Sequence, residues 1–179
     1  HMLVTAGTLG VVTEDWKILS NNHVIAASNQ GKTGDPVIQP GRYDGGTDND
    51  IIAALERFVT IQPRDAGYNL VDAAVARPLE PPSAYVTKDI LGIGRVAGWT
   101  DPYVGMPVYK SGRTTGASRS YIIDVNATIK VSGYPFGDAI FTDQILFDNP
   151  GMSVIAPGDS GSLLVTYVGN APVAVGLCF

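Results

Sequence analysis

Residues 157–162 read PGDSGS, a cluster of turn-forming residues between the strand-like runs Gln144–Phe147 and Ser162–Tyr167. Glycines on both sides of Ser160 allow the backbone to turn sharply and another molecule to approach closely. Successive N–H groups in such a turn form a concavity that attracts an oxyanion. The segment is therefore typical of a loop that presents a serine nucleophile, although the same residues also form ordinary surface turns.

The rest of the chain has the composition of an all-β protein. Its 179 residues include 21 glycines and 12 prolines, well above the average share, and 45% hydrophobic residues. Short β-branched and aromatic runs recur between Gly-, Pro-, Asn- and Asp-rich segments, which is the pattern of strands joined by turns. Gly169-Asn170 predicts a hairpin turn. Only Asn22–Ser28 and Ala84–Leu91 are expected to be helical, each as a short segment.

Charge and hydropathy exclude several classes of partner. The net charge of −5 provides no basic surface, so no nucleic-acid partner is expected. No apolar run approaches the ~20 residues that span a bilayer, so no membrane partner is expected, and no signal peptide is visible. Cys178 is the only cysteine, which excludes an intramolecular disulfide and favours a reducing, cytoplasmic setting while leaving the localisation open.

A serine hydroxyl needs a general base to become a nucleophile. Apart from His1 at the terminus, His23 is the only histidine, and it follows an apolar strand. The base in turn needs an orienting carboxylate. Asp72 lies at the start of the otherwise apolar run Val71–Ala76, where a carboxylate is costly unless it is paired. The alternative carboxylates lie in loops that look solvated: Asp48, Asp50 and Asp65.

A metal site is a further hypothesis for the acidic loop of residues 44–50. Its carboxylates, Asp44, Asp48 and Asp50, supply the oxygen ligands that Ca²⁺ prefers, but their spacing departs from the EF-hand pattern. A solvated loop is the commoner meaning of such a sequence. The sequence therefore predicts no metal and no cofactor.

The order and surroundings of His23, Asp72 and Ser160 resemble the bacterial branch of the chymotrypsin-like serine peptidases. Residues 21–25 (NNHVI) are similar to the histidine segment of HtrA-type members, and residues 158–161 (GDSG) match the nucleophile motif. The family's Asp-x-Ala strand and a segment near the start of its second barrel have counterparts at residues 71–75 (VDAAV) and 110–116 (KSGRTTG). The resemblance covers nearly the whole chain.

This resemblance implies an all-β fold of two six-stranded antiparallel barrels. The N-terminal barrel would span residues 3–77 and carry His23 and Asp72, and the C-terminal barrel would span residues 104–179 and carry Ser160. Residues 78–103 would link them. The three prolines within residues 78–82 indicate the same boundary independently, because proline is excluded from central strands.

The implied function is that of a serine endopeptidase acting on a protein or peptide through an acyl-enzyme. The N–H groups of Gly158 and Ser160 would form the oxyanion hole. Val154, Ile155 and Cys178 are the expected lining of the substrate pocket. Because nothing acidic lies among them, a preference for Arg or Lys is not supported.

Two departures from the family pattern qualify this prediction. Ser162 stands where relatives commonly have a second glycine, and the sequence stops at Phe179, where relatives continue along one wall of the substrate cleft. The second barrel is therefore expected to be incomplete, with the remainder in a missing segment or a second chain. The alternative function is a binding or scaffold module that is inactive in this form. An α/β-hydrolase fits poorly, because no histidine follows Ser160.

Overall fold

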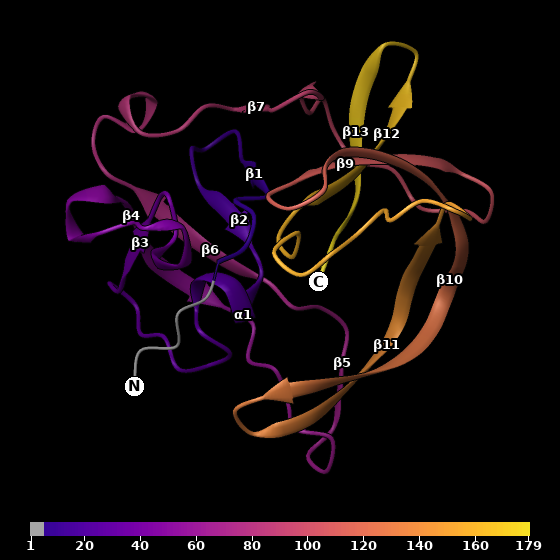
Figure 1. Ribbon diagram of the computed structural model, residues 1–179, viewed down its shortest axis with the longest axis horizontal. Helices are drawn as coiled ribbons and strands as arrows, with labels where there is room; N and C mark the ends of the chain where they lie inside the picture. Colours follow the sequence, from indigo (N-terminus) through magenta and orange to yellow (C-terminus); the bar gives the residue numbers. More distant parts are fainter. Residues whose placement is uncertain (1–5) are drawn as a thin grey trace.

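The computed structural model describes residues 6–179, and its regular structure is almost entirely β-strand (Figure 1). The strands form two main sheets. The sheet of the indigo-to-magenta half of the chain lies beside the sheet of the orange-to-yellow half. This arrangement confirms the predicted all-β fold class.

The first sheet contains five strands in the order β1-β2-β6-β4-β3, and every neighbouring pair is antiparallel. Alternate residues of a strand face opposite sides, and the inward side chains of Ile18, Leu55 and Ala76 are at most 1% exposed. Within residues 6–179 this sheet has one strand fewer than predicted, and residues 3–5 of the predicted barrel lie outside the described residues. Its strands are β1 (Val11–Val12), β2 (Ile18–Ser20), β3 (Pro36–Ile38), β4 (Ile51–Phe58) and β6 (Ala74–Pro78).

The second sheet contains six strands in the order β13-β12-β9-β10-β11-β5. Two of them, β10 and β11, form a long curved hairpin whose pairing is interrupted by irregularities in register (Figure 1). A buried cluster of the second sheet includes Val108 of β9, Ile122 of β10 and Leu164 of β12. The predicted hairpin turn is confirmed, since Val168 pairs with Ala171 across Gly169-Asn170. The strands are β5 (Tyr68–Asn69), β9 (Pro107–Gly112), β10 (Gly116–Tyr134), β11 (Gly137–Asp148), β12 (Leu163–Val168) and β13 (Ala171–Leu177).

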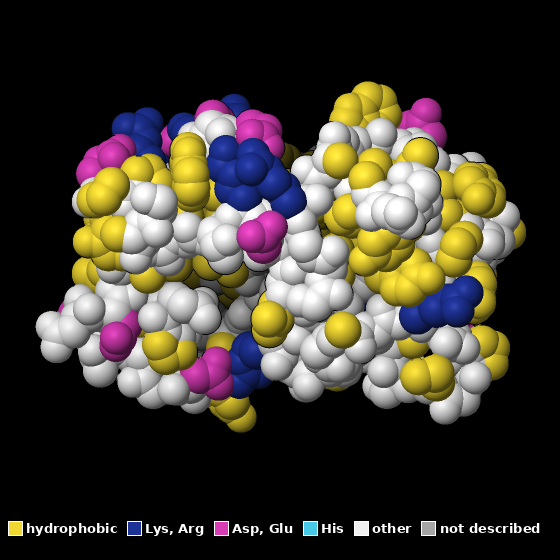
Figure 2. All heavy atoms as spheres, turned by 90° about the horizontal axis from the view of Figure 1, so that it is seen from above, with side chains coloured by type: hydrophobic (Ala, Val, Ile, Leu, Met, Phe, Trp, Pro, Cys, Tyr) yellow, Lys and Arg dark blue, Asp and Glu magenta, His cyan; other side chains and the backbone are white. Residues whose placement is uncertain are grey.

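The segment between the sheets carries only short elements: the 3₁₀ turn η3 (Pro82–Ala84) and the paired strands β7 (Asp89–Ile90) and β8 (Gly94–Arg95). The helix expected over residues 84–91 is therefore wrong. Glu14 forms ion pairs with Lys88 and Arg95 beside these strands. On the face shown in Figure 2, Lys and Arg side chains lie close to Asp and Glu side chains.

One α-helix, α1 (Asn22–Ile25), begins two residues after β2, and the two other 3₁₀ turns are η1 (Arg42–Asp44) and η2 (Asp48–Asp50). The helix ends earlier than the predicted Ser28, because Ala27 and Ser28 adopt left-handed backbone conformations with φ of +49° and +54°. No helix within residues 6–179 is long and apolar enough to cross a membrane.

Candidate active site

His23 and the buried Asp72 form a pair at the end of the first sheet. Strand β2 leads into α1, and Asp72 lies two residues before β6, which pairs with β2. The His23 ring nitrogen Nδ1 lies 2.5 Å from Asp72 Oδ2, and the His23 backbone N–H donates to Asp72 Oδ1 at 3.2 Å. The Asp72 side chain is fully buried, whereas 27% of the His23 side chain is exposed. The carboxylate therefore fixes the orientation of the imidazole ring. The other ring nitrogen, Nε2, points away from Asp72.

The two asparagines before His23 anchor this pair. Asn21 Nδ2 donates to the Asp72 carbonyl at 2.7 Å. Asn22 Nδ2 donates to the Val59 carbonyl and to Asn29 Oδ1, both at 2.7 Å. Asn29, whose φ is +73°, extends the network. The two asparagines of residues 21–25 (NNHVI) therefore have a structural role, because their side-chain amides hold the loops around His23 by hydrogen bonds. Nothing in the sequence indicated that Asn29 takes part.

Ser160 lies against the segment that precedes β1. Its carbonyl accepts a 2.7 Å hydrogen bond from the backbone N–H of Thr8. A Cβ atom built on Gly7 would lie 2.6 Å from the Val24 side chain and 3.0 Å from the Ser160 carbonyl oxygen. Because Val24 directly follows His23, the backbone of Ser160 lies close to the helix that carries His23.

The turn around Ser160 requires its flanking glycines. Gly158 and Gly161 have φ of +102° and +95°, a region that other residues adopt only under strain. A Cβ atom on Gly161 would also approach the Thr8 carbonyl oxygen to 2.1 Å and Ser20 Oγ to 2.4 Å. Gly161 therefore allows the turn to pack on Thr8 and the end of β2, whereas Gly158 allows it to pack on Arg113 and Thr114 of the connection between β9 and β10.

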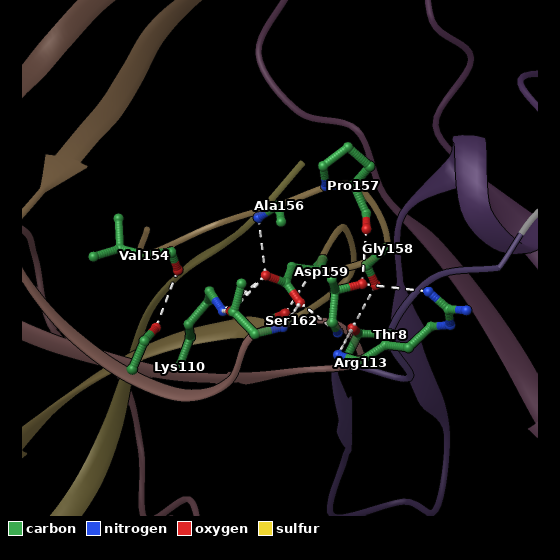
Figure 3. Close-up of polar contacts among 12 residues, drawn as sticks. Thr8, Lys110, Arg113, Val154, Ala156, Pro157, Gly158, Asp159 and Ser162 are labelled. Carbon is green, nitrogen blue, oxygen red and sulfur yellow. Dashed lines mark hydrogen bonds and ion pairs between the residues drawn. The ribbon is translucent and has the colours of Figure 1, made fainter. Parts of the chain in front are cut away.

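Asp159 holds the nucleophile turn in place through a buried ion pair with Lys110 (Figure 3). Its carboxylate lies 3.1 Å from Lys110 Nζ, and the two side chains are at most 1% exposed. The backbone N–H groups of Thr114, Thr115 and Ala156 also donate to it at 2.8–3.0 Å. Burial alone would raise the pKa of Asp159, but hydrogen bonds from Thr115, Thr114 and Lys110 lower that pKa to about 2.

Two of the predicted pocket residues, Val154 and Ile155, lie in the segment between β11 and β12, and the third, Cys178, directly follows β13. Val154 is 5% exposed and its carbonyl accepts a hydrogen bond from Ser118 Oγ, whereas Ile155 is 37% exposed. Cys178 packs in the core of the second sheet, and burial raises the pKa of its thiol to about 12, so it is an inert thiol. The role of these three residues as a pocket stays a prediction.

The carboxylates of the acidic loop, residues 44–50, all form ion pairs or hydrogen bonds with other protein groups. Asp44 pairs with Arg113, Asp48 pairs with Arg42, and Asp50 accepts hydrogen bonds from Thr47. These contacts engage the carboxylates that were considered for Ca²⁺. Within the described part of the chain, no group of three or more His, Cys, Asp or Glu residues could hold a metal ion.

Two clefts flank the segment of residues 7–9. The first, of about 490 Å³, is bordered by Val24 and Ile25 of α1 and by strand β3. The second, of about 430 Å³, is bordered by residues 85–91 and by Arg113. The first cleft therefore opens beside the helix that carries His23.

No protein-family model matches this chain, and no curated protein matches it. Among solved structures, it is similar to a glutamic acid-specific serine protease, with a TM-score of 0.58 and 19% identity over 93% of this chain and 74% of that chain. A chymotrypsin from Cellulomonas bogoriensis gives 0.54 and 21% over 94% and 79%, and a Nocardiopsis protease gives 0.54 and 20% over 94% and 80%. The HtrA-like character of residues 21–25 stays a prediction. The chain therefore has the fold of the bacterial chymotrypsin-like serine proteases.

Proposed function

We propose that this chain is a serine endopeptidase in which His23 and Asp72 come from the lobe of residues 3–77 and Ser160 from the lobe of residues 104–179. The observation that carries the proposal is the 2.5 Å contact between His23 and the buried carboxylate of Asp72, next to a glycine-flanked serine turn. A buried carboxylate paired with a partly exposed histidine is the arrangement that a general base requires.

In the proposed reaction, Ser160 Oγ attacks the carbonyl carbon of the scissile bond. His23 takes the hydroxyl proton and returns it to the leaving amine, which leaves an acyl-enzyme for water to hydrolyse. Asp72 holds Nδ1 of the imidazole protonated, so that Nε2 is the nitrogen available as the base.

The N–H groups of Gly158 and Ser160 are the proposed oxyanion donors. In the same turn, the N–H groups of Asp159, Gly161 and Ser162 bond to the carbonyls of Ala156, Cys178 and Asp159, at 2.8–2.9 Å. The N–H groups of Gly158, just before these residues, and of Ser160, between them, are then the ones proposed to face a substrate. Each such donor contributes about 2.7–4 kcal/mol of transition-state stabilisation.

The substrate is a protein or peptide, and an apolar side chain is the proposed preference of the pocket near Val154 and Ile155. One structural neighbour is described as a glutamic acid-specific protease that uses a histidine triad in substrate binding. This chain has only two histidines, and the proposed mechanism uses one of them. Recognition of glutamate by three histidines is therefore unavailable to residues 1–179.

A fluorophosphonate probe tests the proposal, because it reacts only with an activated serine. We expect stoichiometric labelling that mass spectrometry maps to Ser160, and no labelling of Ser160→Ala. His23→Ala should slow the labelling by orders of magnitude, while Ser153→Ala, which changes an exposed serine near the turn, should not. A folded protein without labelling would instead support the binding or scaffold function, since the fold would then be present without an activated nucleophile.

A further inference from the structure

The tip of the β10–β11 hairpin reaches the His23–Asp72 pair of the candidate active site. Tyr134, the last residue of β10, points its hydroxyl at Asp72 Oδ2 from 3.4 Å. Its ring also meets the His23 ring edge-on, with 6.5 Å between centroids and 73° between planes. Figure 1 shows how this hairpin curves away from β9, β12 and β13 toward β5, at the other edge of the same sheet.

Packing holds Tyr134 in this place. Its ring stacks on Phe136 with a 5.1 Å centroid separation, and both residues pack against a buried cluster that contains Ile61 and Phe141. Strand β11 also pairs in parallel with β5, three residues before Asp72. The hairpin tip and the loop that carries Asp72 are therefore parts of one packed unit.

We propose that Tyr134 is a positioning residue for the His23–Asp72 pair, donating a hydrogen bond to the carboxylate and covering one side of the imidazole. This inference rests on the proposed peptidase function. Asp72 Oδ1 accepts from the His23 backbone, and Oδ2 faces both His23 Nδ1 and the Tyr134 hydroxyl. With the Tyr134 hydroxyl, three donors hold the Asp72 carboxylate, and they restrict its rotation more than two would. They also provide hydrogen bonds to its buried oxygens, which water does not reach.

The hydroxyl stays protonated, as a donor must be. Burial and the neighbouring charge of Asp72 both raise the pKa of Tyr134. His23 and Asp72 are the titratable groups that face it, while Lys130 and Asp138 of the same hairpin pair with each other at 3.4 Å on the outside. Tyr134 therefore acts as a neutral donor across the working range of a peptidase.

Tyr134→Phe tests the role because it removes the hydroxyl and keeps the ring. We expect kcat to fall about three- to tenfold, the scale of one net hydrogen bond, with KM unchanged. Without this donor, more of the carboxylate charge acts on the imidazole. The acidic limb of the kcat/KM profile should therefore move to higher pH. Tyr121→Phe, which changes an exposed tyrosine of the same strand, is the matched control and should match the wild type.

Proton NMR provides a readout that needs no turnover. The far-downfield resonance of the His23 Nδ1 proton should shift in Tyr134→Phe and stay in place in Tyr121→Phe. An unchanged resonance together with a wild-type kcat and pH profile would overturn the positioning role. If the wild type itself neither turns over nor reacts with the fluorophosphonate, the peptidase function fails, and the resonance still decides whether Tyr134 bonds to Asp72.

Discussion

At the scale of single residues, two buried carboxylates have opposite surroundings. Asp72 faces a histidine that is partly open to solvent, whereas Asp159 faces a lysine that is as buried as itself. A fixed cation beside Asp159 keeps that carboxylate ionised and static. In the proposed mechanism, the imidazole beside Asp72 instead takes up and returns a proton. The Lys110–Asp159 pair therefore holds the turn, and proton transfer is the role proposed for the His23–Asp72 pair.

Asp72→Asn should separate these roles. We expect turnover to fall by about 10⁴, the loss known for this substitution in a Ser-His-Asp triad, because the amide no longer selects the correct imidazole tautomer. Asp65→Asn, in an exposed loop, is the control and should leave kcat unchanged. Turnover within tenfold of wild type in Asp72→Asn would assign the orienting role to another group.

Lys110→Met should cost about 3–5 kcal/mol of the free energy of unfolding at pH 7, because it leaves Asp159 charged and buried without its cation. The folded-state pKa of Asp159 is lowered from 3.8 to about 2, so its stabilising contribution is complete above about pH 4 and is lost as the pH falls toward 2. Urea titrations at several pH values should show the difference between Lys110→Met and wild type shrinking over that range. A difference that is constant down to pH 2 would contradict the assigned ion pair.

At the scale of elements, local patterns predicted most strands, the hairpin turn at Gly169-Asn170 and the short helix after β2. They did not predict that β5 joins the second sheet, since two residues in a loop carry no periodic signal. The residues of the candidate site likewise fall into those that the sequence predicted and one that it did not. Motifs singled out His23, Asp72 and Ser160, whereas Tyr134 was missed because its contact with Asp72 depends on the curvature of a long hairpin. Tertiary packing, not local preference, decides such contacts.

Asn69 is the residue of β5 that ties the two halves together. Its side chain accepts from the Gln62 N–H at 2.7 Å and donates to the carbonyls of Gln62 and Ile140 at 3.0 and 3.1 Å. Asn69→Ala should lower the free energy of unfolding by about 1–3 kcal/mol, because buried backbone groups lose their partners. Chemical denaturation checks this, with exposed Asn126→Ala expected to stay within about 0.5 kcal/mol of wild type. Equal stabilities of the two variants would rule out this anchoring role.

At the scale of the whole molecule, the proposed site depends on a fixed relation between the two sheets, because His23 and Ser160 belong to different halves. Thr8 connects them through three hydrogen bonds. Its N–H donates to the Ser160 carbonyl, its hydroxyl donates to the Gly158 carbonyl at 3.0 Å, and the Arg113 N–H donates to the same hydroxyl at 2.9 Å. The segment before β1 is therefore bonded directly to the nucleophile turn.

This connection predicts that the two sheets unfold as one cooperative unit. Native-state hydrogen exchange should give the slowest amides of β4 and β12 the same free energy of opening, since neither sheet keeps its packing without the other. Thr8→Val keeps the shape of the side chain and removes its hydroxyl, so it should lower both values equally, by about 1–3 kcal/mol. Ser28→Ala, in the loop after α1 and without a hydrogen bond to Thr8 or the nucleophile turn, should change neither. A fall confined to β12, or different opening free energies for β4 and β12 in the wild type, would mean that the halves fold independently and that the site assembles only when they dock.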